Sequence, residues 1–487
     1  MKSQDTKAKV IYSLMWKFFE RGGTQGIQLV VQILLARLLL PEDYGVIAVV
    51  TTFIVIANVF VQSGLNTALV QKKDADEVDF SSIFYLSLSI AGVLYIILFF
   101  SSPFIADFFR MQELKLVLRV LSLKLFFGAF NSIQNAYVAK HMMFKKLFFS
   151  SLGAIVLSGA AGVVTAFLGW GVWALVAQQL VSQISITLIL WFTVKWRPLL
   201  VFSFKKVKVL FSYGSKLLAS SLIDHIYKEI RTLIIGRIFT KDVLGIYSKG
   251  QQYPRILAIN INDSIQAVML PALSLHQDNK PKVKSMVRRS IVTSSFIMFP
   301  AMIGLAAVAE PMVKVLLTEK WLPSVPFLRI FCMTYALWPI HTANLQAINS
   351  LGRSDIFLKL EIVKKIIGVS ILIVSIRYGV FYMALGVLLS GIISSFVNAY
   401  PNKKLLNYSY FEQCKDLLPS LIIASIMGGS VYAISFLNLE TILILLLQIV
   451  AGVIIYVGMS KIFKIEAYEY LVKTAKDLLK KRKEATN

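Results

Sequence analysis

Charged residues are scarce in this sequence. Asp, Glu, Lys and Arg make up only 16% of the 487 residues, and 57% are hydrophobic, whereas about 25% charged residues is usual in soluble proteins. Apolar runs of about 20 residues recur along the whole length, and a helix of that length crosses a bilayer. The runs are continuous rather than alternating, which excludes an outer-membrane β-barrel. The sequence therefore predicts an all-α polytopic membrane protein.

Cysteine, histidine and catalytic motifs are also rare. Cys332 lies in an apolar run and Cys414 in a loop, so we expect no structural disulfide. The four histidines are scattered without metal-ligand spacing. The chain lacks a Gly-x-x-x-x-Gly-Lys-Ser/Thr phosphate loop, a Gly-x-Ser-x-Gly elbow and a His-Glu-x-x-His motif. We therefore expect no cofactor, no metal, no direct use of ATP and no enzyme activity, with an intramembrane transferase as the exception left open.

The net charge of +25 lies mostly in short loops and at the two ends. In a soluble protein it would suggest nucleic acid, but the positive-inside rule explains it here, so we expect no nucleic-acid partner. The Lys- and Arg-rich loops place both termini in the cytoplasm. We expect about fourteen spans, at residues 14–40, 45–70, 80–102, 116–138, 147–168, 172–194, 210–238, 244–271, 289–309, 324–349, 356–376, 380–400, 417–437 and 441–461.

The predicted spans form two six-helix lobes plus two extra C-terminal helices. Residues 1–194 are the N-lobe and residues 210–400 the C-lobe, joined by an interfacial linker at 195–209. Residues 401–461 hold spans thirteen and fourteen. Residues 462–487 have an apolar face at helical spacing that basic side chains surround. This pattern predicts a basic amphipathic helix on the cytoplasmic leaflet.

A weak internal repeat supports the two lobes. Residues 37–46 (Arg-Leu-Leu-Leu-Pro-Glu-Asp-Tyr-Gly-Val) align without a gap with residues 237–246 (Arg-Ile-Phe-Thr-Lys-Asp-Val-Leu-Gly-Ile). The Arg, an acidic residue and the Gly keep their spacing. Such a repeat, with polar helices at matching places, is typical of a secondary transporter. Chance similarity between two apolar segments is the alternative.

The first predicted span carries a polar stripe. Lys17, Arg21, Gln25, Gln28 and Gln32 follow one another on one helical face. A Lys or Arg at the bilayer centre costs about 2.5–3.5 kcal/mol on insertion scales. We therefore expect this stripe to face other helices or a water-filled cavity.

The seventh predicted span is the richest in ionisable residues. They are Lys216, Asp224, His225, Lys228, Glu229 and Arg231. Bases outnumber acids, and a surplus of fixed positive charge suits an anion, above all a phosphate, which Arg holds bidentately. The alternative is that Asp224–Lys228 and His225–Glu229 pair along the helix and only hold the lobes together.

Amides and acids on other spans complete the candidate site. Amides suit sugar hydroxyls, which both donate and accept hydrogen bonds, and the polar-cavity candidates are Gln25, Gln28, Asn58, Gln62 and Asn262. For any single amide, interhelical bonding is the stronger alternative. An H⁺ or Na⁺ gradient would act through an acid, and the ion-coupling candidates are Glu20, Asp224, Glu229 and Asp263.

Several segments resemble a known family. They are Ala36 to Gly45 (Ala-Arg-Leu-Leu-Leu-Pro-Glu-Asp-Tyr-Gly), Ser63-Gly64-Leu65, Ala68-Leu69-Val70-Gln71 and Asn349-Ser350-Leu351-Gly352-Arg353. With fourteen spans and a six-plus-six repeat, the chain resembles the MOP exporter superfamily over nearly its whole length. Within that superfamily it looks like the polysaccharide transporter branch, the Wzx-type flippases for O-antigen, colanic-acid-like or teichuronic-acid-like repeat units.

The resemblance implies a V-shaped, two-lobed carrier in the bacterial cytoplasmic membrane that works by alternating access. Its substrate would be a polyprenyl pyrophosphate-linked oligosaccharide, whose head group crosses in a cationic cavity while the lipid tail stays in the bilayer. The family's basic cavity residues carry over, as residue types only, onto Arg21, Lys216, Lys228, Arg231 and Arg255. The partners implied are this lipid-linked substrate, an H⁺ or Na⁺ gradient, the lipid bilayer and the polysaccharide polymerase machinery.

Three other functions stay open. A lipid II flippase would also need a basic cavity, but it would bind a different head group. A multidrug/cation antiporter of the same superfamily would need acids for cationic drugs, whereas this sequence offers more bases. An intramembrane transferase, or a scaffold for the polymerising machinery, would not transport at all.

Overall fold

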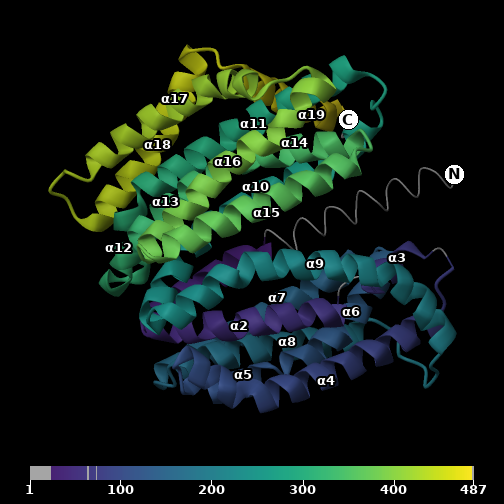
Figure 1. The fold of residues 1–487 in the computed structure, drawn as a ribbon. Coiled ribbons are helices and arrows are strands. Elements are labelled where there is room, and N and C mark those ends of the chain that lie inside the picture. The colour runs from purple at the N-terminus through teal and green to yellow at the C-terminus, as the bar shows by residue number, and fades with distance from the viewer. Residues whose placement is uncertain (1–22, 63–64, 73, 485–487) are drawn as a thin grey trace. The chain divides into compact units, whose positions relative to one another are not determined.

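The structure, a computed structural model, describes residues 23–62, 65–72 and 74–484 (Figure 1). All regular elements in these ranges are helices. The described chain divides into two compact units, residues 1–248 and residues 249–487, and the boundary lies inside helix α10. The predicted lobe and linker boundaries remain predictions.

The first unit contains a helix over residues 23–38 and then α2 to α9. The bounds are α2 (Pro41–Gln62), α3 (Leu65–Gln71), α4 (Glu77–Phe109), α5 (Glu113–Leu121), α6 (Lys124–Lys140), α7 (Phe144–Phe167), α8 (Val172–Thr193) and α9 (Phe204–Ile238). Helix α10 (Lys241–Ser274) begins in this unit and continues into the next.

The second unit contains the rest of α10 and the helices that follow it. Their bounds are α11 (Lys280–Ala307), α12 (Ala309–Leu317), the 3₁₀ helix η1 (Glu319–Ser324), α13 (Val325–Ala336), α14 (Trp338–Ser350), α15 (Ser354–Ile376), α16 (Val380–Leu406), α17 (Tyr410–Ile434), α18 (Thr441–Ile462) and α19 (Glu466–Glu484). Helix α11 packs against α13, α14 and α17 at the centre of this unit.

Ten helical segments of the described chain are long and apolar enough to cross a membrane, with α5 and α6 together forming one of them. The prediction of an all-α polytopic membrane protein is therefore confirmed. The four other predicted spans coincide with helices too: residues 23–38, α9, the α13–α14 pair and α15. Helices α9 and α15 carry several charged residues, and the tenth predicted span is broken at Leu337, two residues before Pro339.

The connection before α9 is fastened to the beginning of α4. The backbone amides of Leu199 and Ser203 donate to the hydroxyls of Ser81 and Ser82, at 2.9 and 3.0 Å. Trp196 is buried in the same core as residues from α3, α4, α6 and α8. Helix α9 begins at Phe204, six residues before the predicted start of the seventh span, because the Ser203 side chain caps its first turn.

An ion pair reinforces this connection. Lys206, in the first turn of α9, binds the carboxylate of Asp76 ahead of α4. This hydrogen bond lowers the pKa of Asp76 to about 2. Within the first unit, α9 then runs along α2, α3 and α4 and packs against all three (Figure 1).

The two copies of the internal repeat meet at their glycines. In each copy one helix ends at residue 38 or 238 and the next begins at Pro41 or Lys241. A Cβ on Gly45 would lie 1.8 Å from the Lys241 carbonyl oxygen, and a Cβ on Gly245 would lie 1.8 Å from the Pro41 carbonyl oxygen. Each glycine therefore packs against the first residue of the other copy's helix, and the contact is reciprocal. The similarity found in the sequence corresponds to a shared local structure.

Helix α19 is fastened to α11 through Arg288. Two guanidinium nitrogens of Arg288 donate to the carboxylate of Glu466 at 2.9 and 2.8 Å, and a third lies 3.1 Å from Asp416. Arg289 adds a contact with the ring of Tyr470, at 4.9 Å from the centroid. The predicted C-terminal helix is therefore present, and its first turn is bound to the second unit. Its binding to a lipid leaflet remains a prediction.

We expect Gly45→Ala and Gly245→Ala each to destabilise the protein. A methyl group at either position would overlap a backbone carbonyl, which cannot move away as a flexible side chain would. Overpacking of this kind typically costs about 1–3 kcal/mol, and the apparent melting temperature in detergent measures it. Gly429→Ala is the matched control, because nothing lies within 4 Å of its added Cβ. Equal melting temperatures for all three variants would contradict the reciprocal contact.

We expect the docking of α19 to weaken in acid. The hydrogen bonds from Arg288 lower the pKa of Glu466 below its usual 4.5. Because the pKa is lowered when α19 is docked, ionised Glu466 stabilises docking at pH values above its usual pKa. This stabilisation is lost as the pH falls through the lowered pKa. Glu466→Gln should therefore speed limited proteolysis of α19 at neutral pH. The exposed Glu469→Gln, one turn along, is the control, and equal cleavage of both would show that the Arg288 contact does not hold the helix.

Candidate functional site

Helix α9 carries most of the predicted ionisable site residues. It runs without interruption from Phe204 to Ile238 and contains Lys216, Asp224, His225, Lys228, Glu229 and Arg231. A single long helix places the described side chains among them on defined faces, because side chains three and four positions apart lie above one another; the Lys216 side chain lies outside the described part of the structure. Arg21 and Glu20, the candidates from the first predicted span, lie outside the described residues.

Lys228 and Asp224 form the predicted pair along the helix. The Lys228 ammonium lies 2.6 Å from the Asp224 carboxylate, and the two side chains are 58% and 39% exposed. The pairing that the sequence suggested is therefore present. Where water reaches it, an i,i+4 pair of this kind contributes only about 0.3–0.5 kcal/mol.

Arg231 is a cation on α9 with a buried donor that the described residues do not satisfy. Its side chain is half-buried, and its guanidinium carbon lies 5.7 Å from the ring centroid of Tyr227. Its Nε is buried and has no hydrogen-bond partner in the described structure. Buried polar groups normally have partners, so an anion would satisfy a donor that the described residues leave unsatisfied.

Glu229 faces α2 rather than His225. Its carboxylate accepts a hydrogen bond of 3.0 Å from the hydroxyl of Thr52, a buried residue of α2. The Nδ1 of His225 lies 2.8 Å from the backbone oxygen of Ser221. The predicted His225–Glu229 pair is therefore wrong for this structure, because α9 packs on α2 and turns the carboxylate toward that helix.

The amide candidates of α2 bond to each other. Gln62 donates from Nε2 to the Asn58 Oδ1 at 3.2 Å. Gly128 of α6 lies against them, since a Cβ there would come 2.8 Å from the Asn58 oxygen. The hydrogen bond lies within α2, so Asn58 and Gln62 partly satisfy each other where α6 packs against them. On the helix over residues 23–38, Gln25 is half-buried and Gln28 is exposed.

The candidates on α10 lie in the second unit. Arg255 is exposed, and Asp263 is half-buried. Asn262 is 9% exposed and accepts a hydrogen bond from Thr342 of α14. Asn262 therefore joins two helices of that unit. Arg255 is the most accessible of the three side chains.

A buried amide cluster in the second unit was not predicted. Asn344 and Gln413 exchange two hydrogen bonds of 2.7 and 3.0 Å, and Asn402 donates to the Asn344 Oδ1 at 2.7 Å. All three side chains are fully buried. They come from α14, α17 and α16, so no spacing along the sequence could reveal the cluster. These bonds link three helices, although the Asn402 Oδ1 has no partner in the described structure, which indicates a role in holding helices together.

Side chains that could bind a metal ion do not cluster in the described ranges. No group of three or more His, Cys, Asp or Glu side chains there could hold a metal ion. The acid Glu361, which the sequence places among lysines, lies 2.5 Å from Lys364. The bases of α9 stay candidate ligand-binding residues.

The chain was also compared with known proteins. The model of the family "Polysaccharide biosynthesis protein" matches residues 34–326. The teichuronic acid biosynthesis protein TuaB of Bacillus subtilis is 28% identical over 62% of this chain, and the match spans 63% of TuaB. The lipopolysaccharide biosynthesis protein WzxC of Escherichia coli is 24% identical over 87% of this chain and 88% of its own.

Solved structures show the same fold. The lipid II flippase MurJ in an inward closed conformation has a TM-score of 0.73 at 17% identity, over 95% of this chain and all of that one. An inward-facing multidrug resistance MATE family transporter of the MOP superfamily has a TM-score of 0.59 at 16% identity, over 78% of this chain and 96% of that one. The resemblance to polysaccharide biosynthesis proteins is therefore confirmed by the family match, and the solved structures show the shared fold.

Proposed function

This chain belongs to the polysaccharide biosynthesis protein family, and on that premise we propose that it is a flippase for a lipid-linked sugar. It moves a polyprenyl pyrophosphate-linked oligosaccharide repeat unit from the cytoplasmic to the outer leaflet by alternating access, for surface polysaccharide biosynthesis. The relatives named for teichuronic acid and lipopolysaccharide biosynthesis support the substrate class. A relative named as the succinoglycan transport protein ExoT of Rhizobium meliloti supports transport.

The observation that carries the proposal is the basic face of α9. Between residues 216 and 231 it has three bases and two acids. Asp224 is paired with Lys228 and Glu229 with Thr52, whereas the buried Nε of Arg231 is unsatisfied in the described structure. Guanidinium donors match the geometry of phosphate oxygens, so the pyrophosphate of the substrate binds here.

The remaining parts of the proposal rest on charge distribution and on the family. The Lys- and Arg-rich loops support cytoplasmic termini, and the bacterial relatives support the bacterial cytoplasmic membrane. An H⁺ or Na⁺ gradient supplies energy through Asp224, Glu229 or Asp263. The polysaccharide polymerase machinery receives the product on the outer face.

Two transport alternatives differ in head group. The MurJ-like fold alone does not separate a lipid II flippase from an oligosaccharide flippase. A multidrug/cation antiporter needs acids that are free to hold a cation, and the two acids of this stretch of α9 have partners. The basic surplus therefore favours an anionic lipid substrate.

We expect Arg231→Ala and Lys228→Ala to block transport without loss of the protein from the membrane. Cells with either variant should accumulate the polyprenyl pyrophosphate-linked oligosaccharide on the cytoplasmic leaflet and lose surface polysaccharide. Lipid extraction with mass spectrometry, read beside membrane protein levels, tests this. Lys359→Ala, an exposed base on α15 outside the site, is the control. Normal lipid intermediates in cells lacking the whole protein, together with altered resistance to cationic dyes, would instead indicate drug export.

We expect neutralisation of an acid to change the dependence of transport on an ion gradient. Asp224→Asn, Glu229→Gln and Asp263→Asn are compared in inverted vesicles, with an imposed pH or Na⁺ gradient and a lipid-linked sugar analogue. The acid that couples transport should leave downhill exchange intact while abolishing the response to one gradient. If all three variants respond as the wild type does, coupling does not involve these carboxylates.

A further inference from the structure

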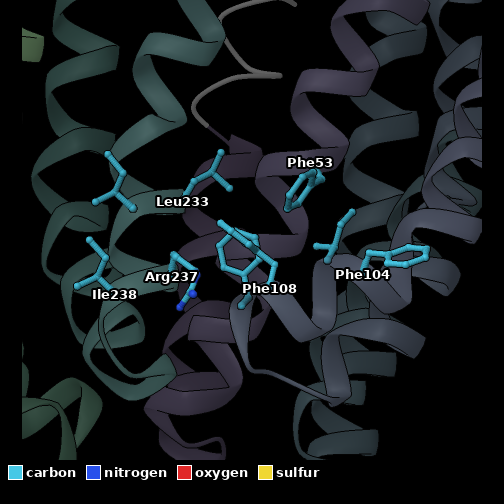
Figure 2. A pocket seen from close by; sticks show the side chains of 9 residues that line it. Phe53, Phe104, Phe108, Leu233, Arg237 and Ile238 are labelled. Carbon is cyan, nitrogen blue, oxygen red and sulfur yellow. The ribbon is translucent and has the colours of Figure 1, made fainter.

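A groove of about 550 Å³ lies between α2, α4 and α9 in the unit of residues 1–248 (Figure 2). Its lining is apolar except for one residue, and consists of Phe53, Phe104, Ile105, Phe108, Phe109, Leu233, Ile234, Arg237 and Ile238. The volume is within the range of about 300–1,000 Å³ that small-molecule pockets occupy. None of the site candidates discussed above lines it.

The groove has a packed floor and an open rim. Gly236 lets α9 approach α2 closely, because an added Cβ would come 2.8 Å from Val49. Phe109 is 5% exposed and stands edge-on to Phe53, with 5.9 Å between the ring centroids. By contrast, the rim residues Phe104, Phe108 and Ile238 are all more than half exposed. In a membrane-spanning unit, such a hollow apolar surface fits a hydrocarbon chain.

Arg237 is the exception in this lining. Its guanidinium carbon lies 4.8 Å from the ring centroid of Phe108, and Figure 2 shows the two side chains next to each other. The side chain is half-buried, and no ion pair in the described ranges involves it. Glu42 and Glu113, the acids at the start of α2 and α5, pair with Lys241 instead. A cation on an apolar wall that forms no ion pair in the described ranges is a place for an anionic group.

The position of Arg237 suits a lipid head group. It is the last residue but one of α9, so it lies at the end of a predicted span, where lipid phosphates are found. Leu233 and Arg237 are four residues apart on α9, which is about 6 Å along the helix axis. The groove therefore accommodates the part of an acyl chain that lies nearest the lipid head group.

We propose that this groove is a binding site for an anionic glycerophospholipid, with one acyl chain on the phenylalanines and the phosphate on Arg237. Charge complementarity selects this occupant. The groove has one cation, which matches the single negative charge of a phosphodiester, whereas a polyprenyl pyrophosphate carries more charge than one Arg can neutralise. The site is separate from the basic face assigned to the transported substrate, so its occupancy can be tested without reference to transport.

Native mass spectrometry of the purified full chain, with added phosphatidylglycerol, tests the proposal. Loss of a charge-assisted phosphate contact should weaken retention of the tightest-bound lipid by about tenfold in Arg237→Gln. Ile238→Trp, a substitution at the exposed rim, should also lower retention by narrowing the groove while it leaves the cation in place. Arg37→Gln is the matched control, because it removes the same charge at the equivalent position of the internal repeat and does not touch the groove.

Three outcomes would contradict the proposal, each in a different way. Equal retention of phosphatidylglycerol by the wild type and Arg237→Gln would mean that lipid covers this surface without a site, and would overturn the proposal. Retention of phosphatidylcholine as strong as that of phosphatidylglycerol would overturn the charge argument. If undecaprenyl phosphate, and not phosphatidylglycerol, were retained in an Arg237-dependent way, the occupant would be an isoprenoid and the proposal would be wrong. Thermal melting of each variant shows whether it is folded.

Discussion

Hydrocarbon offers no hydrogen bonds, and most of this structure can be understood from that constraint. A backbone polar group inside a bilayer must be satisfied by the protein itself, which leaves continuous helices as the solution for the described chain. Polar side chains in the same helices meet the same requirement. Asn58 bonds to Gln62, Glu229 accepts from Thr52, and the amides of Asn344 and Gln413 bond reciprocally.

Two arginines that form no ion pair in the described ranges are informative. Arg231 keeps a buried donor unsatisfied in the described structure, and Arg237 lies on an aromatic ring at the edge of an apolar groove. A membrane protein retains such cations at a cost, so they point to ligands that bring negative charge. Both arginines lie on α9, which also packs along α2, α3 and α4. One helix therefore combines a structural face with candidate binding residues.

The repeat shows how a weak sequence signal can carry a strict structural requirement. Only the Arg, an acidic residue and the Gly keep their spacing between residues 37–46 and 237–246. The structure gives the reason for the glycine, because Gly45 and Gly245 each face a backbone carbonyl at a distance that no Cβ allows. Lys241 strengthens the same junction through Glu42 and Glu113, each at 3.1 Å. Side chains away from this junction were free to diverge.

The sequence by itself determined the fold class, the approximate positions of the spans, the repeat and the Asp224–Lys228 pair, because hydropathy, helical spacing and i,i+4 pairing are local properties. It did not determine the partner of Glu229, the amide cluster of Asn344, Gln413 and Asn402, or the groove at Arg237. Glu229 and Thr52 are 177 positions apart, and Asn344 lies 58 and 69 positions from Asn402 and Gln413. Which residues so distant come together depends on helix packing, and that was decided only by the tertiary structure.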